Sequence, residues 1–176
     1  MKKLFIIPTA ILFSFCCTNK EVMKKEEDNK IVTKTESPCP SDGVCTTEIL
    51  KNKSLLIKTD EFGSTYTQTT DSETTSVIVY QYNRIVKGDL QDAGYKEEII
   101  FEINNNDREL TLTNEELQQT KMHFGRFCFC RGQTGYYKVE EGKLNLKKLD
   151  NNIIFNLDFT ITKVPQIIKT ITTSIN

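Results

Sequence analysis

The sequence contains no tryptophan and only one histidine, and its charges almost cancel. Because His123 is the only imidazole, any nucleophile–base pair that uses histidine must use this one, and no serine or aspartate signature lies beside it. The absence of tryptophan weakens a function based on stacking against sugars. The formal net charge of −1 leaves no basic excess to neutralise phosphates, so we expect no nucleic-acid partner.

A hydrophobic run long enough to span a membrane is also missing. The apolar stretch at residues 4–15 has about a dozen residues, whereas a spanning helix needs about 20. Two lysines precede the stretch and two cysteines follow it, where a small-residue cleavage site is expected. This arrangement resembles the lipoprotein signal of Gram-negative bacteria, which signal peptidase II cuts just before a cysteine that carries the lipid.

The resemblance implies lipidation at one of the two cysteines. Lipidation of Cys16 would place the bulky Phe15 at the site where a small residue is usual. Lipidation of Cys17 places Cys16 there instead, although Ser14 then stands where leucine is typical. We therefore predict a signal peptide at residues 1–16 and lipidation of Cys17, with Cys16 as the alternative. An ordinary secretory signal is the competing interpretation.

Residues 17–37 are charged and poor in large apolar side chains, which predicts a lipid anchor followed by a flexible tether. The lysine-plus-acid clusters at residues 20–21 and 24–28 resemble the export signals of surface lipoproteins in the Bacteroidota. The resemblance implies a protein held in the outer membrane by its N-terminal lipid, either surface-exposed or facing the periplasm. The competing interpretation is a solvated linker.

Residues 38–176 alternate between apolar and polar side chains, which is typical of strands with one buried face. The clearest run is Phe155, Leu157, Phe159 and Ile161. In residues 77–82 both alternating sets are apolar, so this strand is expected to be covered on both faces. The pattern predicts a single antiparallel β-sandwich, with a closed β-barrel as the alternative.

Three turn-forming stretches, at residues 104–107, 140–142 and 150–152, are interpreted as hairpin turns. Residues 113–121 are the only helical candidate, and Asn114 is the expected cap of one short turn through Leu117.

Four cysteines remain in the predicted domain: Cys39, Cys45, Cys128 and Cys130. An exported chain meets an oxidising compartment, so this even number predicts disulfides. In an extended strand the Cα atoms of Cys128 and Cys130 would lie about 6.7 Å apart with parallel side chains. We therefore expect each of them to pair with Cys39 or Cys45, which would pin residues 38–46 onto strand 126–131 and stabilise the fold by roughly 4 kcal/mol.

The same cysteines also raise two sharper hypotheses. A four-thiolate zinc site is disfavoured because neither pair has the usual spacing of two to four residues between ligands. A reactive redox pair is the second hypothesis, since Arg126 and Arg131 flank the Cys-x-Cys motif and a positive setting favours thiolate. Two structural disulfides remain the expected state, with no metal and no cofactor.

Other polar clusters have weaker signals. Residues 88–94 begin like a calcium loop but lack its later ligands, so they are interpreted as a turn. His123 is expected at the surface or on an edge strand. The glycine-bounded segment 132–135 is a candidate recognition tip, because the residues around it are of types enriched at binding hot spots. The candidate tip residues are Arg131, Gln133, Tyr136 and Tyr137. The competing interpretation is a hairpin whose tyrosines pack on the sheet.

Together these features predict a lipid-anchored lipoprotein of the cell envelope with a disulfide-braced β domain. Its expected role is a non-enzymatic binding or structural module, with an envelope protein, a glycan or an exported protease as partner. The sequence shows no catalytic set, so no catalytic residue is assigned. The alternative is a small metal- or thiol-dependent enzyme or metal carrier that uses the cysteine cluster with His123.

Overall fold

The structure is a computed structural model that describes residues 30–34, 39–86, 88, 93–150 and 152–175. The first six strands are β1 (Lys30–Lys34), β2 (Gly43–Leu50), β3 (Lys53–Thr59), β4 (Thr65–Asp71), β5 (Thr75–Arg84) and β6 (Tyr95–Asn104). The remaining elements are β7 (Glu109–Thr113), the 3-10 helix η2 (Asn114–Thr120), β8 (His123–Cys128), β9 (Gly135–Lys138), β10 (Glu141–Leu149), β11 (Asn152–Thr160) and β12 (Thr170–Ile175).

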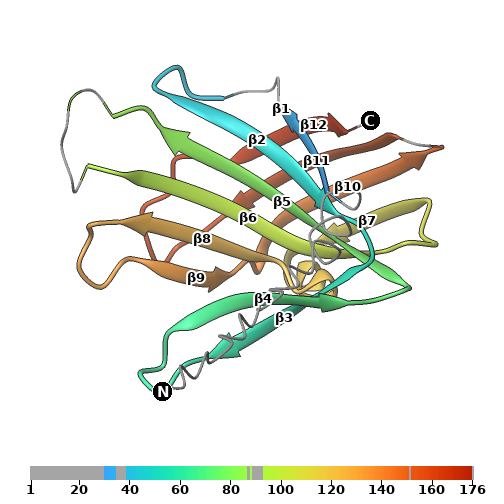
Figure 1. The fold of residues 1–176 in the computed structure, drawn as a ribbon, viewed down its shortest axis with the longest axis horizontal. Coiled ribbons are helices and arrows are strands. Elements are labelled where there is room, and N and C mark those ends of the chain that lie inside the picture. Colours follow the sequence, from blue (N-terminus) through green and yellow to red (C-terminus); the bar gives the residue numbers. More distant parts are fainter. Residues whose placement is uncertain (1–29, 35–38, 87, 89–92, 151, 176) are drawn as a thin grey trace, which may run out of the picture.

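Two antiparallel sheets face each other, and a hairpin forms a third layer (Figure 1). The larger sheet has the order β1-β2-β5-β6-β8-β9, and the smaller one has the order β12-β11-β10-β7. The β3–β4 hairpin packs on the outer face of the larger sheet. Neither sheet closes on itself within the described residues, so the predicted all-β sandwich is confirmed over the barrel alternative.

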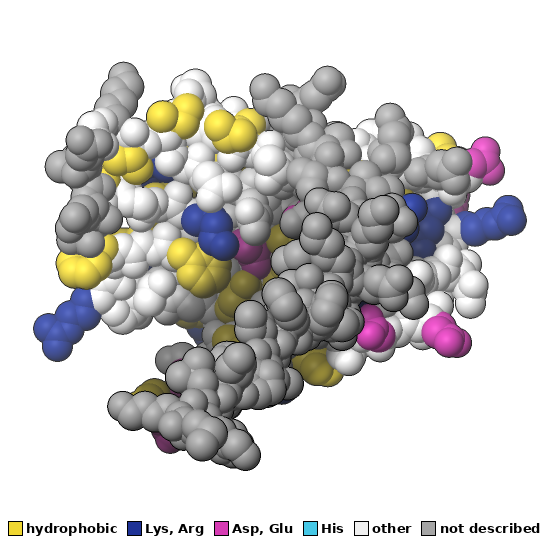
Figure 2. Space-filling view, in the orientation of Figure 1, with side chains coloured by type: hydrophobic (Ala, Val, Ile, Leu, Met, Phe, Trp, Pro, Cys, Tyr) yellow, Lys and Arg dark blue, Asp and Glu magenta, His cyan; other side chains and the backbone are white. Residues whose placement is uncertain are grey.

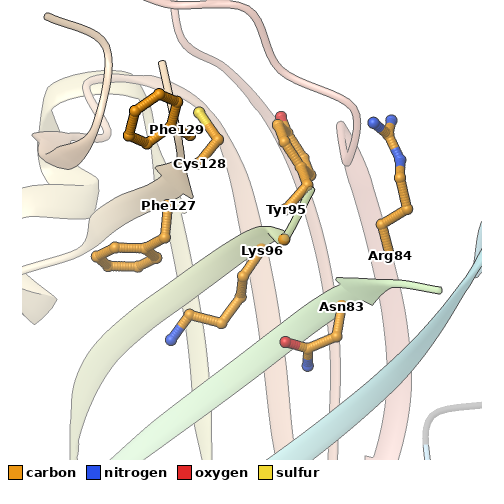
Figure 3. Close-up of a pocket in the computed structure, with 8 residues that line it drawn as sticks. Asn83, Arg84, Tyr95, Lys96, Phe127, Cys128 and Phe129 are labelled. Atoms are coloured by element: carbon orange, nitrogen blue, oxygen red, sulfur yellow. The ribbon is translucent and has the colours of Figure 1, made fainter. Parts of the chain in front are cut away.

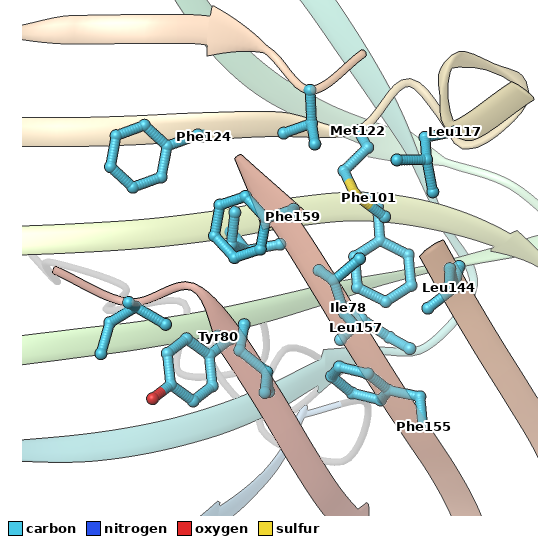
Figure 4. Close-up of a cluster of buried hydrophobic side chains, with 14 of the residues drawn as sticks. Ile78, Tyr80, Phe101, Leu117, Met122, Phe124, Leu144, Phe155, Leu157 and Phe159 are labelled. Carbon is cyan, nitrogen blue, oxygen red and sulfur yellow. The ribbon is translucent and has the colours of Figure 1, made fainter. Parts of the chain in front are cut away.

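The main core fills the space between the two sheets. Alternate residues of β11 point into it, and Phe155, Leu157 and Phe159 are buried as their spacing predicts. Phe101 of the larger sheet meets Phe155 edge-to-face, with ring centroids 5.4 Å apart (Figure 4). Burial of this many large apolar side chains is the main force that holds the two sheets together.

The strand β5 is covered on both faces, as its sequence predicts. Ile78, Tyr80 and Tyr82 point into the main core. Val77 and Val79 point outward and form a second cluster with Leu55 of β3 and Ile100 of β6. The β3–β4 hairpin therefore covers this outer side of β5.

A carboxylate fastens the hairpin to the sheet. Glu102 of β6 accepts hydrogen bonds from the Leu55 amide at 2.6 Å and the Ser54 hydroxyl at 2.8 Å. The ammonium of Lys121 also donates to it at 2.9 Å. Burial alone would raise the pKa of Glu102, but these donors outweigh it and hold the pKa below its usual value.

Two of the three predicted hairpin turns instead connect the two sheets. Residues 104–107 lead from β6 in the larger sheet to β7 in the smaller one, and residues 138–141 lead from β9 to β10 in the same way. Turn residues show where a strand ends, but they do not show which strand the chain pairs with next. The third turn is confirmed as a hairpin, because Leu149 of β10 pairs with Asn152 of β11.

The helical segment is confirmed, but its predicted cap is wrong. Thr113 occupies the N-cap position, and the carboxylate of Glu116 accepts hydrogen bonds from both its amide and its hydroxyl at 2.9 Å. The Glu116 carboxylate thus satisfies the Thr113 amide, which the start of the helix leaves without a partner. Asn114 instead adopts a positive φ of 51° and accepts a hydrogen bond from the Gly142 amide. Leu117 is buried, as expected.

The strand β1 lies within the range 17–37 that was predicted as a tether. Its backbone pairs with β2 from Lys30 opposite Leu50 to Lys34 opposite Thr46. An edge strand is held by backbone hydrogen bonds, so it needs no apolar run in the sequence. The sheet thus extends into the predicted tether. No helix in the described part of the chain is long and apolar enough to cross a membrane.

Candidate functional site

Both disulfides lie at one end of the larger sheet, which we call the disulfide end. The strand register places the start of β2 beside the end of β5, with Gly43 opposite Arg84. It also places the start of β6 beside the end of β8, with Tyr95 opposite Cys128. The start of β2, the end of β5, the start of β6 and the end of β8 therefore lie together at this end, on the left in Figure 1.

The predicted pair of disulfides is confirmed, but the predicted pairing is wrong. Cys39 bonds to Cys45, and Cys128 bonds to Cys130. The strand β8 ends at Cys128, and the chain then bends, so the Cα atoms of Cys128 and Cys130 are 5.1 Å apart rather than at the extended spacing. Residues 38–46 are therefore not pinned onto β8 by a disulfide.

The observed bridges enclose short loops, with sequence separations of 6 and 2. In the chain-entropy description they contribute about 2.4 and about 1.6 kcal/mol respectively, instead of the roughly 4 kcal/mol expected from long loops. Each disulfide braces its own loop rather than joining distant parts of the fold.

An open pocket of about 500 Å³ lies at the disulfide end (Figure 3). Its lining residues are Asn83, Arg84, Gly94, Tyr95, Lys96, Phe127, Cys128 and Phe129. Side chains alternate across the sheet, and Figure 3 shows Phe127 and Lys96 directed to the opposite side from Tyr95 and Phe129. The pocket therefore has lining residues on both faces of the sheet at the start of β6.

Tyr95, which lines this pocket, is the centre of a side-chain cluster. The guanidinium carbon of Arg84 lies 4.7 Å from the centroid of its ring, and that of Arg126 lies 5.4 Å from it. The carboxylate of Asp42 accepts hydrogen bonds from Tyr82 at 2.8 Å and from Arg84 at 3.1 Å. Cation–π contacts and charge-assisted hydrogen bonds together hold the ends of β5 and β6 and the loop before β2 in one arrangement.

Glu97 links the segment between β11 and β12 of the smaller sheet to the same cluster. Its side chain is only 1% exposed, and its carboxylate accepts hydrogen bonds from the amides of Ile167 at 2.7 Å and Ile168 at 2.8 Å. The Tyr95 hydroxyl donates to it at 2.5 Å. Burial and this hydrogen bond raise the pKa of Tyr95 to about 12. Burial and the nearby Glu97 charge raise the pKa of Tyr80 to about 12 as well.

Aromatic side chains also form a platform on the outer face of the sheet. Phe127 and Tyr136 meet edge-to-face with centroids 5.3 Å apart, and both cover Gly125, where an added Cβ would lie 2.7 Å from the Phe127 ring. The ammonium of Lys96 lies 4.4 Å from the centroid of the Phe127 ring and 3.1 Å from the Glu98 carboxylate. Tyr136 donates a hydrogen bond to Glu98 at 2.6 Å.

Of the predicted tip residues, Arg131 and Gln133 lie exposed in the β8–β9 loop at the disulfide end. Gln133 accepts a hydrogen bond from Arg126 at 2.9 Å. Tyr136 and Tyr137 lie on opposite faces of β9, one on the outer platform and the other against the main core. The structure thus brings two of the four residues to the loop and places the two tyrosines on the sheet.

The expected surface position of His123 is wrong. Its side chain is 3% exposed, because β9 extends the sheet beyond β8 and the β3–β4 hairpin lies over this face. Its Nδ1 atom lies 2.8 Å from the Lys121 carbonyl oxygen. Burial lowers the pKa of His123, which favours the neutral imidazole.

Figure 2 shows hydrophobic side chains gathered at the left edge of this face, over the ends of β5 and β8, with a basic side chain beside them. Phe129, the residue after β8, is 84% exposed, and Ile85, the residue after β5, is also exposed. Sequence reasoning missed Asp42, Arg84 and Tyr95. Their contacts join residues 11 to 42 positions apart in the chain. The only available signal was the clustering of aromatic and basic residues at strand ends.

Within the described residues, no group of three or more histidine, cysteine, aspartate or glutamate side chains is placed to hold a metal ion. The predicted lipidation site at Cys17, its alternative Cys16 and most of the calcium-like loop at residues 88–94 lie outside the described residues.

Comparisons with protein-family models, with curated proteins and with solved structures found no match to this chain.

Proposed function

We propose that this chain is a lipid-anchored binding module of the cell envelope that presents its disulfide end to a ligand. The observation that carries the proposal is the open pocket of about 500 Å³ at that end, beside a phenylalanine side chain that is 84% exposed. An aromatic side chain with this exposure, next to arginine and lysine, is typical of a recognition surface.

The rigidity of the disulfide end supports a binding role. Two disulfides brace its loops, and the Arg84–Tyr95–Arg126 stack fixes the strand ends below them. A surface that is ordered before it meets its ligand loses less conformational entropy on binding. Loops held by a rigid sandwich are a common location for such surfaces.

The direction of β1 supports an outward orientation. The chain enters the domain at Lys30, opposite Leu50, which lies at the end of β2 far from the disulfides. Residues 18–29 separate Lys30 from the proposed lipid site at Cys17, and even fully extended they reach at most about 45 Å. An anchored domain would therefore be tied to the membrane at the opposite end, with its pocket facing away.

A photo-crosslinker placed at the pocket tests the binding role. The full chain is expressed in its own host with p-benzoylphenylalanine in place of Phe129, and in a second strain in place of Leu149. Leu149 is a matched control, because it is 57% exposed and is the last residue of β10, at the other end of the sandwich. We expect a discrete adduct with one envelope protein or glycan from position 129 only. The same adducts from both positions, or adducts only with lipid and abundant porins, would refute the proposal.

The lipid anchor needs a separate test. Labelling the cells with an alkyne fatty acid is expected to mark the full chain, and Cys17→Ser is expected to abolish the label. Cys16→Ser is the matched control and should keep it. Loss of the label only in Cys16→Ser would move the anchor by one residue, and absence of the label in the unaltered chain would refute the anchor.

A further inference from the structure

The two disulfides have different surroundings. Cys45 is 1% exposed and belongs to the main core, so the Cys39–Cys45 bond is shielded on one side by packed side chains. Cys128 and Cys130 are both partly exposed, and Cys128 lines the open pocket. Phe129, which stands between them, is almost fully exposed. A thiol in solution can therefore approach the second disulfide at both of its cysteines, whereas in the first disulfide only Cys39 is partly exposed.

The β8–β9 loop has supports that do not depend on its disulfide. The Gln133 amide donates to the Cys130 carbonyl oxygen at 3.1 Å, which closes the turn. The Thr134 hydroxyl donates to the Arg126 carbonyl oxygen at 3.1 Å, and the Arg126 guanidinium donates to the Gln133 side chain at 2.9 Å. The β8–β9 ladder continues beyond them. Opening the Cys128–Cys130 bond therefore leaves the hairpin in place.

Positive charge lies next to Cys128 in the folded sheet. The register places Cys128 opposite Tyr95, whose ring has the guanidinium groups of Arg84 and Arg126 within 4.7 and 5.4 Å of its centroid. Arg84 is paired with Asp42. Arg126 donates to Tyr95 and Gln133, and the register places it opposite the buried Glu97, whose carboxylate accepts a hydrogen bond from the same Tyr95 hydroxyl. A nearby guanidinium favours the thiolate form of a cysteine, which is the form that takes part in exchange.

We propose that Cys128–Cys130 is a thiol–disulfide exchange site that oxidises peptides carrying two thiols. The aromatic side chains of Tyr95 and Phe129 would contact the peptide beside the reactive sulfurs. This inference goes beyond the proposed binding role, because binding needs no reactive group, and it does not depend on the lipid anchor.

The exchange consists of two successive displacements at sulfur. A peptide thiolate attacks one sulfur of the Cys128–Cys130 bond, a mixed disulfide forms, and the other cysteine leaves as a thiolate that takes up a proton. The second thiolate of the peptide attacks the mixed disulfide, which leaves the peptide oxidised by two electrons and the protein as the dithiol. A low-molecular-weight disulfide such as oxidised glutathione restores the protein disulfide by the reverse exchange.

A redox titration tests the first step. The full chain is equilibrated with mixtures of reduced and oxidised glutathione, thiols are alkylated, and each cysteine pair is quantified by peptide mass spectrometry. We expect Cys128 and Cys130 to become reduced while Cys39 and Cys45 stay bonded and the near-ultraviolet circular dichroism stays native. If Cys128–Cys130 resists reduction until the protein unfolds, the proposal is wrong.

A second experiment measures oxidation of a model dithiol peptide by the oxidised full chain in excess. The double variant Cys128→Ser/Cys130→Ser is expected to lose the reaction, and the matched control Cys39→Ser/Cys45→Ser to keep it within about twofold. Cys130→Ser is expected to accumulate a mixed disulfide between Cys128 and an activated thiol peptide. Equal rates for the two double variants, or no adduct on Cys128, would overturn the proposal even if the photo-crosslink at position 129 succeeds.

Discussion

The substitution Glu97→Gln tests the buried carboxylate that joins the two sheets. Glutamine has nearly the same shape, so the change leaves no cavity. It removes the negative charge that accepts hydrogen bonds from Ile167, Ile168 and Tyr95, and it turns an amide group toward a backbone donor. Hydrogen bonds to a charged group contribute about 1.5–3 kcal/mol, and leaving a buried donor unpaired costs about 1–3 kcal/mol. We therefore expect Glu97→Gln to lower the free energy of unfolding by about 3 kcal/mol.

For a domain of this size, that loss corresponds to a melting temperature lowered by roughly 6–12 °C. Urea unfolding followed by near-ultraviolet circular dichroism measures the free energy directly. The matched control is Glu115→Gln, an exposed carboxylate in η2, for which we expect a change within about 0.5 kcal/mol. If the two variants unfold at the same urea concentration, the buried carboxylate does not hold the sheets together as argued.

The same variant carries a spectroscopic prediction. Burial is the main cause of the raised pKa values of Tyr80 and Tyr95, each about 12, and Glu97 adds to both through its charge. Removal of that charge is expected to lower both pKa values toward 10. Tyrosinate absorbance during alkaline titration measures this shift, and an unchanged titration curve would contradict the assigned contribution of Glu97.

Three further predictions concern other parts of the fold. Phe155→Ala removes a fully buried ring and is expected to cost about 3–5 kcal/mol in urea unfolding. Gly125→Ala forces a methyl group against the rings of Phe127 and Tyr136 and is expected to cost about 1–3 kcal/mol. His123 has a folded pKa below its ordinary value of 6.5, so the unfolded chain binds its proton more tightly. The contribution of His123 to the free energy of unfolding is therefore present above pH 6.5 and is lost as the pH falls through the folded pKa. The midpoint of urea unfolding, measured as a function of pH, tests this loss.

Controls make these three outcomes decisive. Leu149→Ala removes an exposed side chain and is the comparison for Phe155→Ala; equal losses would contradict the placement of the core. Tyr136→Ala in the Gly125→Ala background should recover part of the lost stability if the rings cause the clash. His123→Gln should flatten the pH dependence that sets in as the pH falls below 6.5, and an unchanged slope would show that another group titrates there.

The alternation of apolar and polar residues was enough to predict the layers of this fold. A strand has a side-chain period of two, so the runs ending in Ile161 and Tyr82 reveal which faces are buried without any knowledge of their partners. The two-sided burial of β5 followed from the same pattern. The presence of disulfides was predicted from an even number of cysteines in a chain expected to be exported.

The tertiary structure decided how these strands connect and which residues meet. Turn residues end a strand but carry no information on the next pairing partner, so the change of sheet after Asn104 was not predictable. The cysteine pairing depended on the bend that follows Cys128, which the sequence pattern of a strand conceals. The cluster of Arg84, Tyr95 and Arg126 exists because strand register aligns the ends of β5, β6 and β8. Local sequence fixes which faces are buried because that depends only on neighbouring residues, whereas the site depends on alignment across strands distant in the chain.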